Sequence, residues 1–159
     1  MTRELPSSWT VEPLGSLAAW LSGGTPLTSE PAYWGGDIPW ISSGSLTSFH
    51  LWDSARRLTP MGLENGSRLV PAASIIFVVR GMSLKSEFRI GIAKRPMAFG
   101  QDCKALLPRR GVDAAFLAQA VRARSIDVLG MVDEAGHGTG RLATDRIKAL
   151  RIPLPPLRE

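Results

Sequence analysis

The sequence predicts an α+β fold in which helices pack against a mixed, largely antiparallel twisted sheet. Short apolar or alternating segments, each bounded by glycine, proline or serine, cluster ahead of two helical patterns and a last apolar strand. This order differs from the regular strand–helix alternation of a parallel sheet. With 159 residues and 44% apolar side chains, the chain is large enough for one domain with its own core.

Five strands are expected before the helices. In the segment that begins at Phe88, apolar residues alternate with Arg89 and Gly91, so one face of this strand should point inward. The longest apolar run, residues 75–79, is typical of a buried strand. The expected strands are Ile38–Ser42, Ser74–Arg80, Phe88–Ala93, Met97–Gln101 and Lys104–Leu107.

The helices are expected mainly after these strands. Residues 113–124 carry an apolar stripe at helical spacing, with Asp113 as the cap, and a second helix is expected at residues 126–132. A short helix is also expected near the start, at residues 14–19. After a glycine-rich loop, Thr144 can cap one more turn, and prolines end the last strand, which begins at Ile152.

Five motifs follow one another in order over nearly the whole chain. They are Trp9–Leu17 with Ser22–Pro26, Gly35–Ser43, Ser74–Gly81, Gly100–Leu106, and Gly136–Leu142 followed by Ile152–Leu157. In type and order they resemble the target recognition domain of the DNA-specificity subunit of Type I restriction–modification systems. Two features depart from the family's pattern. Gly100-Gln101 stands where Asn-Gln is more usual, and the loop from Arg80 to Leu84 is longer and more basic.

The resemblance implies a single target recognition domain over residues 1–159, ending where the family's long spacer helix would begin. It implies sequence-specific binding of duplex DNA at one half of a bipartite target. It also implies that the domain is not an enzyme. Modification methyltransferase subunits and a restriction subunit, bound through the full-length specificity subunit, would supply the catalysis.

The charge distribution is consistent with a polyanionic partner. Residues 56–110 contain eleven basic and three acidic side chains, a net charge of +8, whereas the remainder carries −3. A basic middle with acidic flanks is typical of a surface that faces phosphates on one side. A generally arginine-rich protein is the alternative, and charge alone does not separate DNA from RNA or from an acidic protein.

The candidate DNA-binding residues follow from the charge and from the resemblance. Arg80 and Arg141 each lie beside a glycine at the end of a regular element. Arginine suits guanine and glutamine suits adenine, because each can form two hydrogen bonds with one base. Trp40 is either a packing residue or, if Ile41 faces the core, a residue that points towards solvent or ligand. The candidates are Trp40, Ser42, Ser43, Arg80, Lys85, Arg89, Lys94, Arg95, Gln101, Thr139 and Arg141.

The sequence shows no pattern for catalysis, a metal or a cofactor. It has no phosphate-binding loop that ends in Lys-Ser or Lys-Thr, and no dinucleotide-binding spacing. His50 and His137 are isolated, and Cys103 is expected in the core rather than as a nucleophile. One cysteine and the lack of an apolar run of membrane-spanning length predict a cytoplasmic domain without membrane contact.

Two other function classes stay open at this point. The chain could be the target recognition domain of a fused restriction–methylation enzyme, in which case catalytic motifs would be encoded in the same reading frame. It could instead be a basic interaction module for nucleic acid or protein, which would show no preference among duplex DNA sequences.

Overall fold

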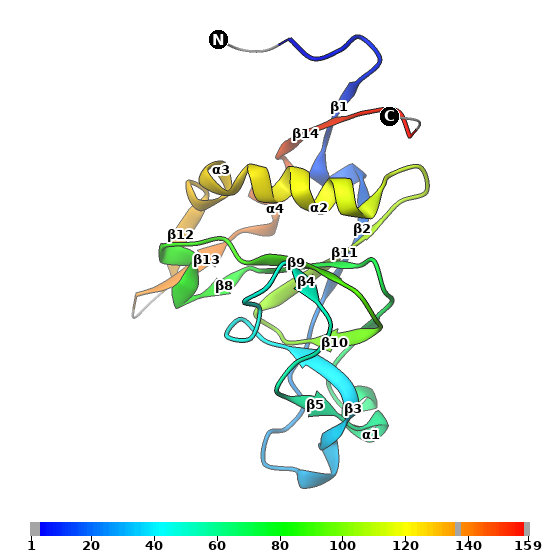
Figure 1. The fold of residues 1–159 in the computed structure, drawn as a ribbon. Helices are drawn as coiled ribbons and strands as arrows, with labels where there is room; N and C mark the ends of the chain where they lie inside the picture. Colours follow the sequence, from blue (N-terminus) through cyan, green and yellow to red (C-terminus); the bar gives the residue numbers. More distant parts are fainter. Residues whose placement is uncertain (1–3, 136–137, 158–159) are drawn as a thin grey trace.

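The computed structural model describes residues 4–135 and 138–157, and its centre is a five-stranded sheet (Figure 1). The strand order is β2 (Ala18–Ser22), β11 (Cys103–Pro108), β7 (Ile75–Val78), β9 (Ile90–Ala93) and β4 (His50–Leu51). Neighbouring strands are antiparallel except β4 and β9, which are parallel. All four residues of β7 are buried, as expected for an apolar run inside a sheet covered on both faces.

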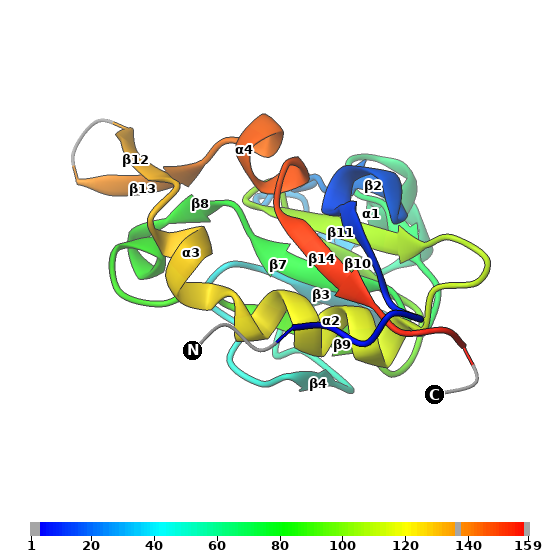
Figure 2. The same cartoon turned by 90° about the horizontal axis from the view of Figure 1, so that it is seen from above.

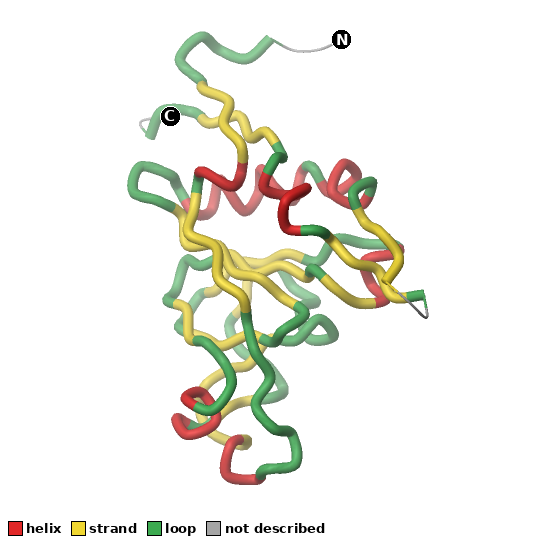
Figure 3. The backbone as a smooth tube through the Cα atoms, turned by 180° about the vertical axis from the view of Figure 1, so that it is seen from behind, coloured by secondary structure: helices red, strands yellow, loops and turns green. Residues whose placement is uncertain are grey.

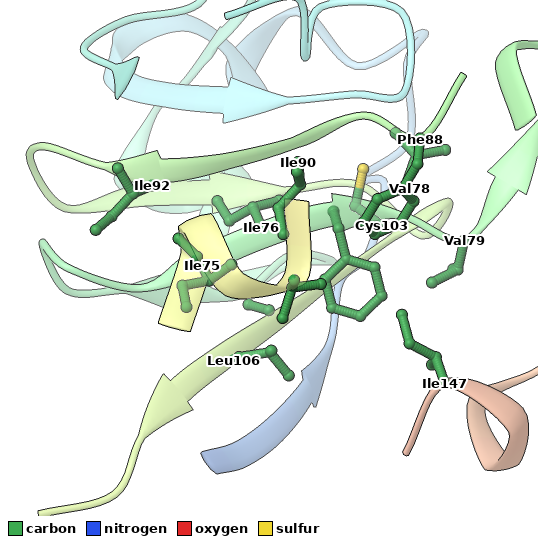
Figure 4. Packing of buried hydrophobic residues seen from close by; sticks show 14 of the residues in the cluster. Ile75, Ile76, Val78, Val79, Phe88, Ile90, Ile92, Cys103, Leu106 and Ile147 are labelled. Atoms are coloured by element: carbon green, nitrogen blue, oxygen red, sulfur yellow. The ribbon is translucent and has the colours of Figure 1, made fainter. Parts of the chain in front are cut away.

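The helix α2 (Ala114–Ala123) covers this sheet and contacts β9, β11 and β14 (Figure 2). Its N-terminus is capped as predicted, because the Asp113 carboxylate accepts a hydrogen bond from the Phe116 amide at 2.8 Å. Leu117 and Val121 on its inner face are fully buried. Figure 4 shows side chains of β7, β9 and β11 gathered beneath this helix, with Ile147 at their edge.

A second sheet of four strands lies at the lower end of the molecule in Figure 1. Its order is β5 (Arg57–Leu58), β3 (Trp34–Ile41), β10 (Met97–Phe99) and β6 (Leu69–Val70). The turn η2 (Pro31–Tyr33) and the helix α1 (Pro60–Glu64) pack beside it. This sheet has its own small core of Trp40, Leu58 and Ala98, with Trp34, Ile38 and Leu63 packed around it.

A three-stranded ribbon extends from one side of the central sheet (Figures 1 and 2). Its order is β12 (Val132–Ala135), β13 (Thr139–Leu142) and β8 (Arg80–Gly81), and every pair is antiparallel. The turn η3 (Met82–Lys85) follows β8 and contacts β13, while α3 (Ser125–Leu129) leads from α2 towards β12. We call these three strands and η3 the ribbon.

The two ends of the described chain meet in a two-stranded sheet, seen from behind in Figure 3. It pairs β1 (Thr10–Pro13) with β14 (Arg151–Leu154). The turn η1 (Leu14–Ser16) follows β1 and packs against α4 (Thr144–Lys148), which precedes β14. The α+β class, with a mixed and mostly antiparallel set of sheets, is therefore confirmed.

The helix predicted at residues 14–19 is wrong beyond its first turn. Residues 14–16 form the single turn η1, and the chain then enters β2 at Ala18. Leu14 and Leu17 are fully buried, and β2 pairs with β11 along its whole length. These long-range contacts outweigh the helical propensity of leucine and alanine.

The segment after α2 differs from its prediction in three details. The helix α3 ends at Leu129, earlier than expected, because Val132 pairs with Leu142 in the β12–β13 hairpin. Thr139 and Gly140, expected in a loop, belong to β13. Thr144 does not cap α4, since Ala143 occupies the cap position and makes no side-chain hydrogen bond there.

The predicted outward face of the strand near Phe88 is also buried in part. Gly91 and Ala93 of β9 are buried alongside Ile90 and Ile92. A β-carbon at Gly91 would lie 2.9 Å from the carbonyl oxygens of Ser48 and Phe49, so the preceding loop lies directly on this face. From the sequence, Gly91 indicated only that another backbone segment could approach this face closely.

Candidate nucleic-acid interface

The ribbon places two predicted arginines next to each other. In the register of β13 with β8, Arg141 lies opposite Arg80 and Gly140 lies opposite Gly81. Residues directly opposite in an antiparallel pair point to the same face, with β-carbons about 4.5–5.5 Å apart. Both arginines are exposed. Two guanidinium groups from distant parts of the sequence therefore share one exposed face.

The carboxylates near this pair form ion pairs with other basic side chains. Asp133 lies opposite Arg141 on β12, but its carboxylate pairs with Arg146 at 3.4 Å. Glu134 pairs with Lys85 at 3.1 Å. Among the described residues, neither Arg80 nor Arg141 forms an ion pair. Like charges directly opposite are unfavourable in a strand pair, so this face is suited to an anion from outside.

Two glycines of the ribbon allow close packing and a sharp change of chain direction. A β-carbon at Gly140 would lie 2.9 Å from the Leu84 β-carbon and 3.1 Å from Val132 Cγ1. Leu84 is thus packed flat on β13 and is almost fully buried. Gly81 has a φ of +145°, a conformation that disfavours other residues. The chain turns there, and the next side chain, Met82, is 74% exposed.

Three further predicted residues lie around the base of the ribbon. Arg89 Nη1 donates to the Ser43 carbonyl at 3.0 Å, while its Nε donates to Glu87. A β-carbon at Gly81 would stand 3.7 Å from Ser43, which brings that serine to the start of η3. The Arg80 and Val79 amides donate to the carbonyl of Asp102, so the exposed Gln101 also lies nearby.

Ser42 and Thr139 are less available than the residues around them. The Ser42 amide donates to Ser45 Oγ at 2.9 Å, and the Ser45 amide donates to Ser42 Oγ at 3.2 Å, so both hydroxyls stabilise a local turn. Thr139 is half-buried in the first position of β13. His137, for which the sequence predicts no metal or catalytic role, lies outside the described residues.

Lys94 and Arg95 lie at the other end of β9 from Arg89. Arg89 and Lys94 are five residues apart, roughly 16 Å in an extended strand. Arg95 Nη2 donates to the Asp37 carbonyl at 3.3 Å, which associates it with β3 and the second sheet. The structure therefore separates the predicted basic residues into two groups, one on the ribbon and one beside the second sheet.

The expectation that Trp40 points away from the core is wrong. Trp40 is only 4% exposed, its Nε1 donates to the Gly24 carbonyl at 3.1 Å, and its ring meets Trp34 edge-to-face at 5.2 Å. Ile41 is fully buried in the main core. Because the two sheets each have a core, β3 is buried on both faces at this point, and Trp40 is a packing residue.

The structure singles out two residues that are not among the candidate DNA-binding residues, although the sequence offers the Arg56–Arg57 pair as an alternative basic face. Met82 is exposed beside Arg80, and Arg56 stacks on the Trp34 ring at 4.1 Å. A lone methionine in a basic loop and one arginine of an Arg-Arg pair carry no pattern that separates them from ordinary surface residues. Their positions follow from the turn at Gly81 and from the packing of β3.

Cys103 is buried in the core, and the structure predicts an inert thiol. Burial, and secondarily the charge of Asp102, raises the pKa of Cys103 from its ordinary 9.0 to about 12. We expect a thiol reagent such as Ellman's reagent to label the protein at pH 8 only after denaturation. Rapid stoichiometric labelling of the native protein would contradict this.

The raised pKa also links stability to pH. Above pH 9 the unfolded chain releases the thiol proton that the folded chain retains, so the free energy of unfolding should fall as the pH rises towards 12.

Within the part of the chain that the structure describes, no group of three or more His, Cys, Asp or Glu residues could hold a metal ion. None of the described helices is long and apolar enough to cross a membrane.

Comparison with known proteins places this architecture in a family. The family model for the Type I restriction modification DNA specificity domain matches residues 6–159. The chain is 28% identical over 148 residues to the EcoR124I/EcoR124II specificity subunit of Escherichia coli, covering 92% of this chain and 37% of that protein. It is 25% identical over 160 residues to the MjaIX specificity subunit of Methanocaldococcus jannaschii, covering 98% and 36%. The chain thus spans just over a third of the length of these relatives.

Solved structures agree on the fold. The HsdS subunit from Thermoanaerobacter tengcongensis superposes with a TM-score of 0.69 at 16% identity, covering 98% of this chain and 35% of that one. The S subunit of a Type I restriction–modification system from M. genitalium gives 0.66 at 16% identity, covering 96% and 36%. Together with the family match over nearly all residues, these findings show that the chain belongs to the Type I restriction modification DNA specificity domain family.

Proposed function

We propose that this domain binds duplex DNA and reads one half of a bipartite target, with the ribbon as its recognition element. The observation that carries the proposal is the Arg80–Arg141 pair, which is exposed, has like charges in direct register and forms no ion pair among the described residues. A phosphate or the acceptor edge of a guanine between the two side chains would relieve their repulsion. The major groove admits a two-stranded β-ribbon, which is the width of the β8–β13 pair that carries the two arginines.

The residues around the pair supply complementary contacts. Gln101 can form two hydrogen bonds with adenine, and Lys85 and Arg89 can contact flanking phosphates after exchanging their surface carboxylate partners. Exposed ion pairs of this kind are worth about 1 kcal/mol or less, so exchange costs little. Met82 presents an apolar side chain that suits a thymine methyl group.

The proposal extends to the partners of the domain. Within a full-length specificity subunit, residues 1–159 would form one target recognition domain and contribute no catalytic residue. Modification methyltransferase subunits and a restriction subunit would bind that full-length subunit, and the cytoplasm would be its compartment. Genes for such a methyltransferase and a restriction translocase beside this one would support the assignment.

Binding by the isolated chain should be weak and steeply dependent on salt. Each phosphate that a basic side chain neutralises adds about −0.9 to the slope of log K against log salt concentration. The measurement is fluorescence anisotropy of a labelled duplex across a salt series, with single-stranded RNA of the same length for comparison. Binding that is equal at low and high salt would contradict a phosphate-facing surface.

Selection from a random duplex pool distinguishes the proposal from a general basic module. A target recognition domain should enrich one short sequence, because it reads only part of a split site. Enrichment of no sequence, together with equal binding to RNA, would assign the basic surface to non-specific interaction instead.

A further inference from the structure

A stacked arginine lies beside the four-stranded sheet, away from the ribbon (Figure 1). The Arg56 guanidinium lies over the Trp34 ring at 4.1 Å and over the Trp40 ring at 4.9 Å. The Arg56 carbonyl accepts a hydrogen bond from the Trp40 amide at 3.0 Å, so its backbone is tied to β3. Stacking and this backbone contact together hold an exposed arginine in one orientation.

The charge of Arg56 is not neutralised within the described residues. Its neighbour Arg57 pairs with Asp53, and the Arg57 Nε donates to Asp53 Oδ1 at 3.0 Å. The hydrogen bonding to Arg57 lowers the pKa of Asp53, which keeps the carboxylate ionised and bound to Arg57. Arg56 forms no ion pair among the residues described, although an arginine edge suits an anion with two acceptor oxygens.

An open hollow of about 530 Å³ lies beside this guanidinium. Both arginines line it, together with Trp34, Gly35 and Gly36 of β3. Neither glycine carries a side chain that could fill the hollow. Gly36 is closely packed, since a β-carbon there would lie 2.7 Å from the Thr59 α-carbon, whereas a β-carbon at Gly35 would meet nothing within 4 Å. Arg95 Nη2 donates to the Asp37 carbonyl nearby, and the Asp37 carboxylate, whose charge also acts on Arg57, offsets part of the positive charge that Arg95 adds.

We propose that this hollow binds a phosphodiester group of the DNA backbone through Arg56, as a contact separate from the ribbon. The proposal rests on the proposed function, because the anion is a phosphate of the same duplex. The stacked guanidinium presents its N–H edge without having to be ordered on binding, and the charge of Arg56, which forms no ion pair among the described residues, favours an anion. The ribbon would then read sequence while this site positions the duplex.

The test compares Arg56→Gln with Arg110→Gln in the full chain. A glutamine amide is flat and can still stack on the tryptophan rings, but it lacks the charge. Arg110 is an exposed arginine on the loop between β11 and α2, so its replacement changes the net charge equally elsewhere. We expect Arg56→Gln to reduce the salt slope of duplex binding by about 0.9, and Arg110→Gln to leave it unchanged.

A scan with single methylphosphonate linkages locates the contact. Wild-type protein should lose affinity when one particular phosphate is neutralised, and Arg56→Gln should be insensitive at that linkage while remaining sensitive at the others. A variant that has merely lost structure would bind every duplex more weakly, whatever the linkage.

The possible results separate this inference from the proposed function. Wild-type binding without salt dependence would overturn both. Normal binding by Arg56→Gln, with the same slope and the same methylphosphonate profile as wild type, would overturn the second site and leave recognition by the ribbon intact. Equal reductions in slope for the Arg56 and Arg110 variants would also overturn it, because they would report only net charge.

Discussion

Replacing Arg80 and Arg141 by alanine is expected to weaken duplex binding by about 1–3 kcal/mol for each arginine that reads a base, roughly 5- to 150-fold in affinity. The two side chains lie in direct register on β8 and β13, so they can share one phosphate or one guanine edge. The affinity of the double variant should therefore fall by less than the sum of the two single effects, which a double-mutant cycle measures as a coupling energy.

The same two alanine variants should not lose thermal stability, although they bind duplex DNA more weakly. The two exposed guanidinium groups repel each other and have no carboxylate partner among the described residues, so their removal should leave the melting temperature unchanged or slightly raised. Arg151→Ala is a matched control, because this exposed arginine lies on β14, a strand of the terminal sheet. It should change neither duplex affinity nor sequence preference.

Arginines that read a base and arginines that hold a phosphate have different signatures in these variants. Removal of a base-reading arginine should relax preference at one position of the selected sequence. Removal of a phosphate-binding arginine should weaken binding to all sequences alike and flatten the salt slope by about one unit. Unchanged affinity in both single variants would move the DNA-binding face to Arg56, Arg57, Lys94 and Arg95.

Gly23→Ala is expected to destabilise the fold by about 3 kcal/mol, at the upper end of the cost of overpacking. A β-carbon at Gly23 would overlap the Gly100 carbonyl oxygen and lie 2.6 Å from Phe99 Cδ2. The obstacles include backbone that is held in place, since the Gly24 amide donates to the Phe99 carbonyl at 3.0 Å. The glycines of this motif therefore allow two chain segments to pass each other at close range.

The measurement is thermal denaturation followed by circular dichroism. For a chain of this size about 3 kcal/mol corresponds to a fall of roughly 6–12 °C in melting temperature. Gly44→Ala is the control, because a β-carbon there would meet only Ser42 Oγ at 3.9 Å, and it should stay within about 0.5 kcal/mol of wild type. A Gly23 variant as stable as the Gly44 variant would contradict the close approach.

The sequence by itself determined the class of fold, the helix α2 and the apolar strands β7 and β11, but it missed β1, β2 and most of the short strands. The apolar stripe and Asp113 cap of α2 are local patterns, and so are the apolar runs of β7 and β11, because each depends on the residues within one element. The order of the motifs was likewise readable, and the family it indicated is confirmed.

Only the tertiary structure decided which candidate residues lie together. Trp40 and Ser42 share a strand pattern that predicts exposure, yet a second small core covers Trp40. Arg80 and Arg141 are distant in sequence, and their pairing depends on the register of β8 with β13. Arg56 became distinct from Arg57 only through its stacking on two tryptophans. Register and packing between distant segments are long-range properties, so no local pattern in the chain encodes them alone.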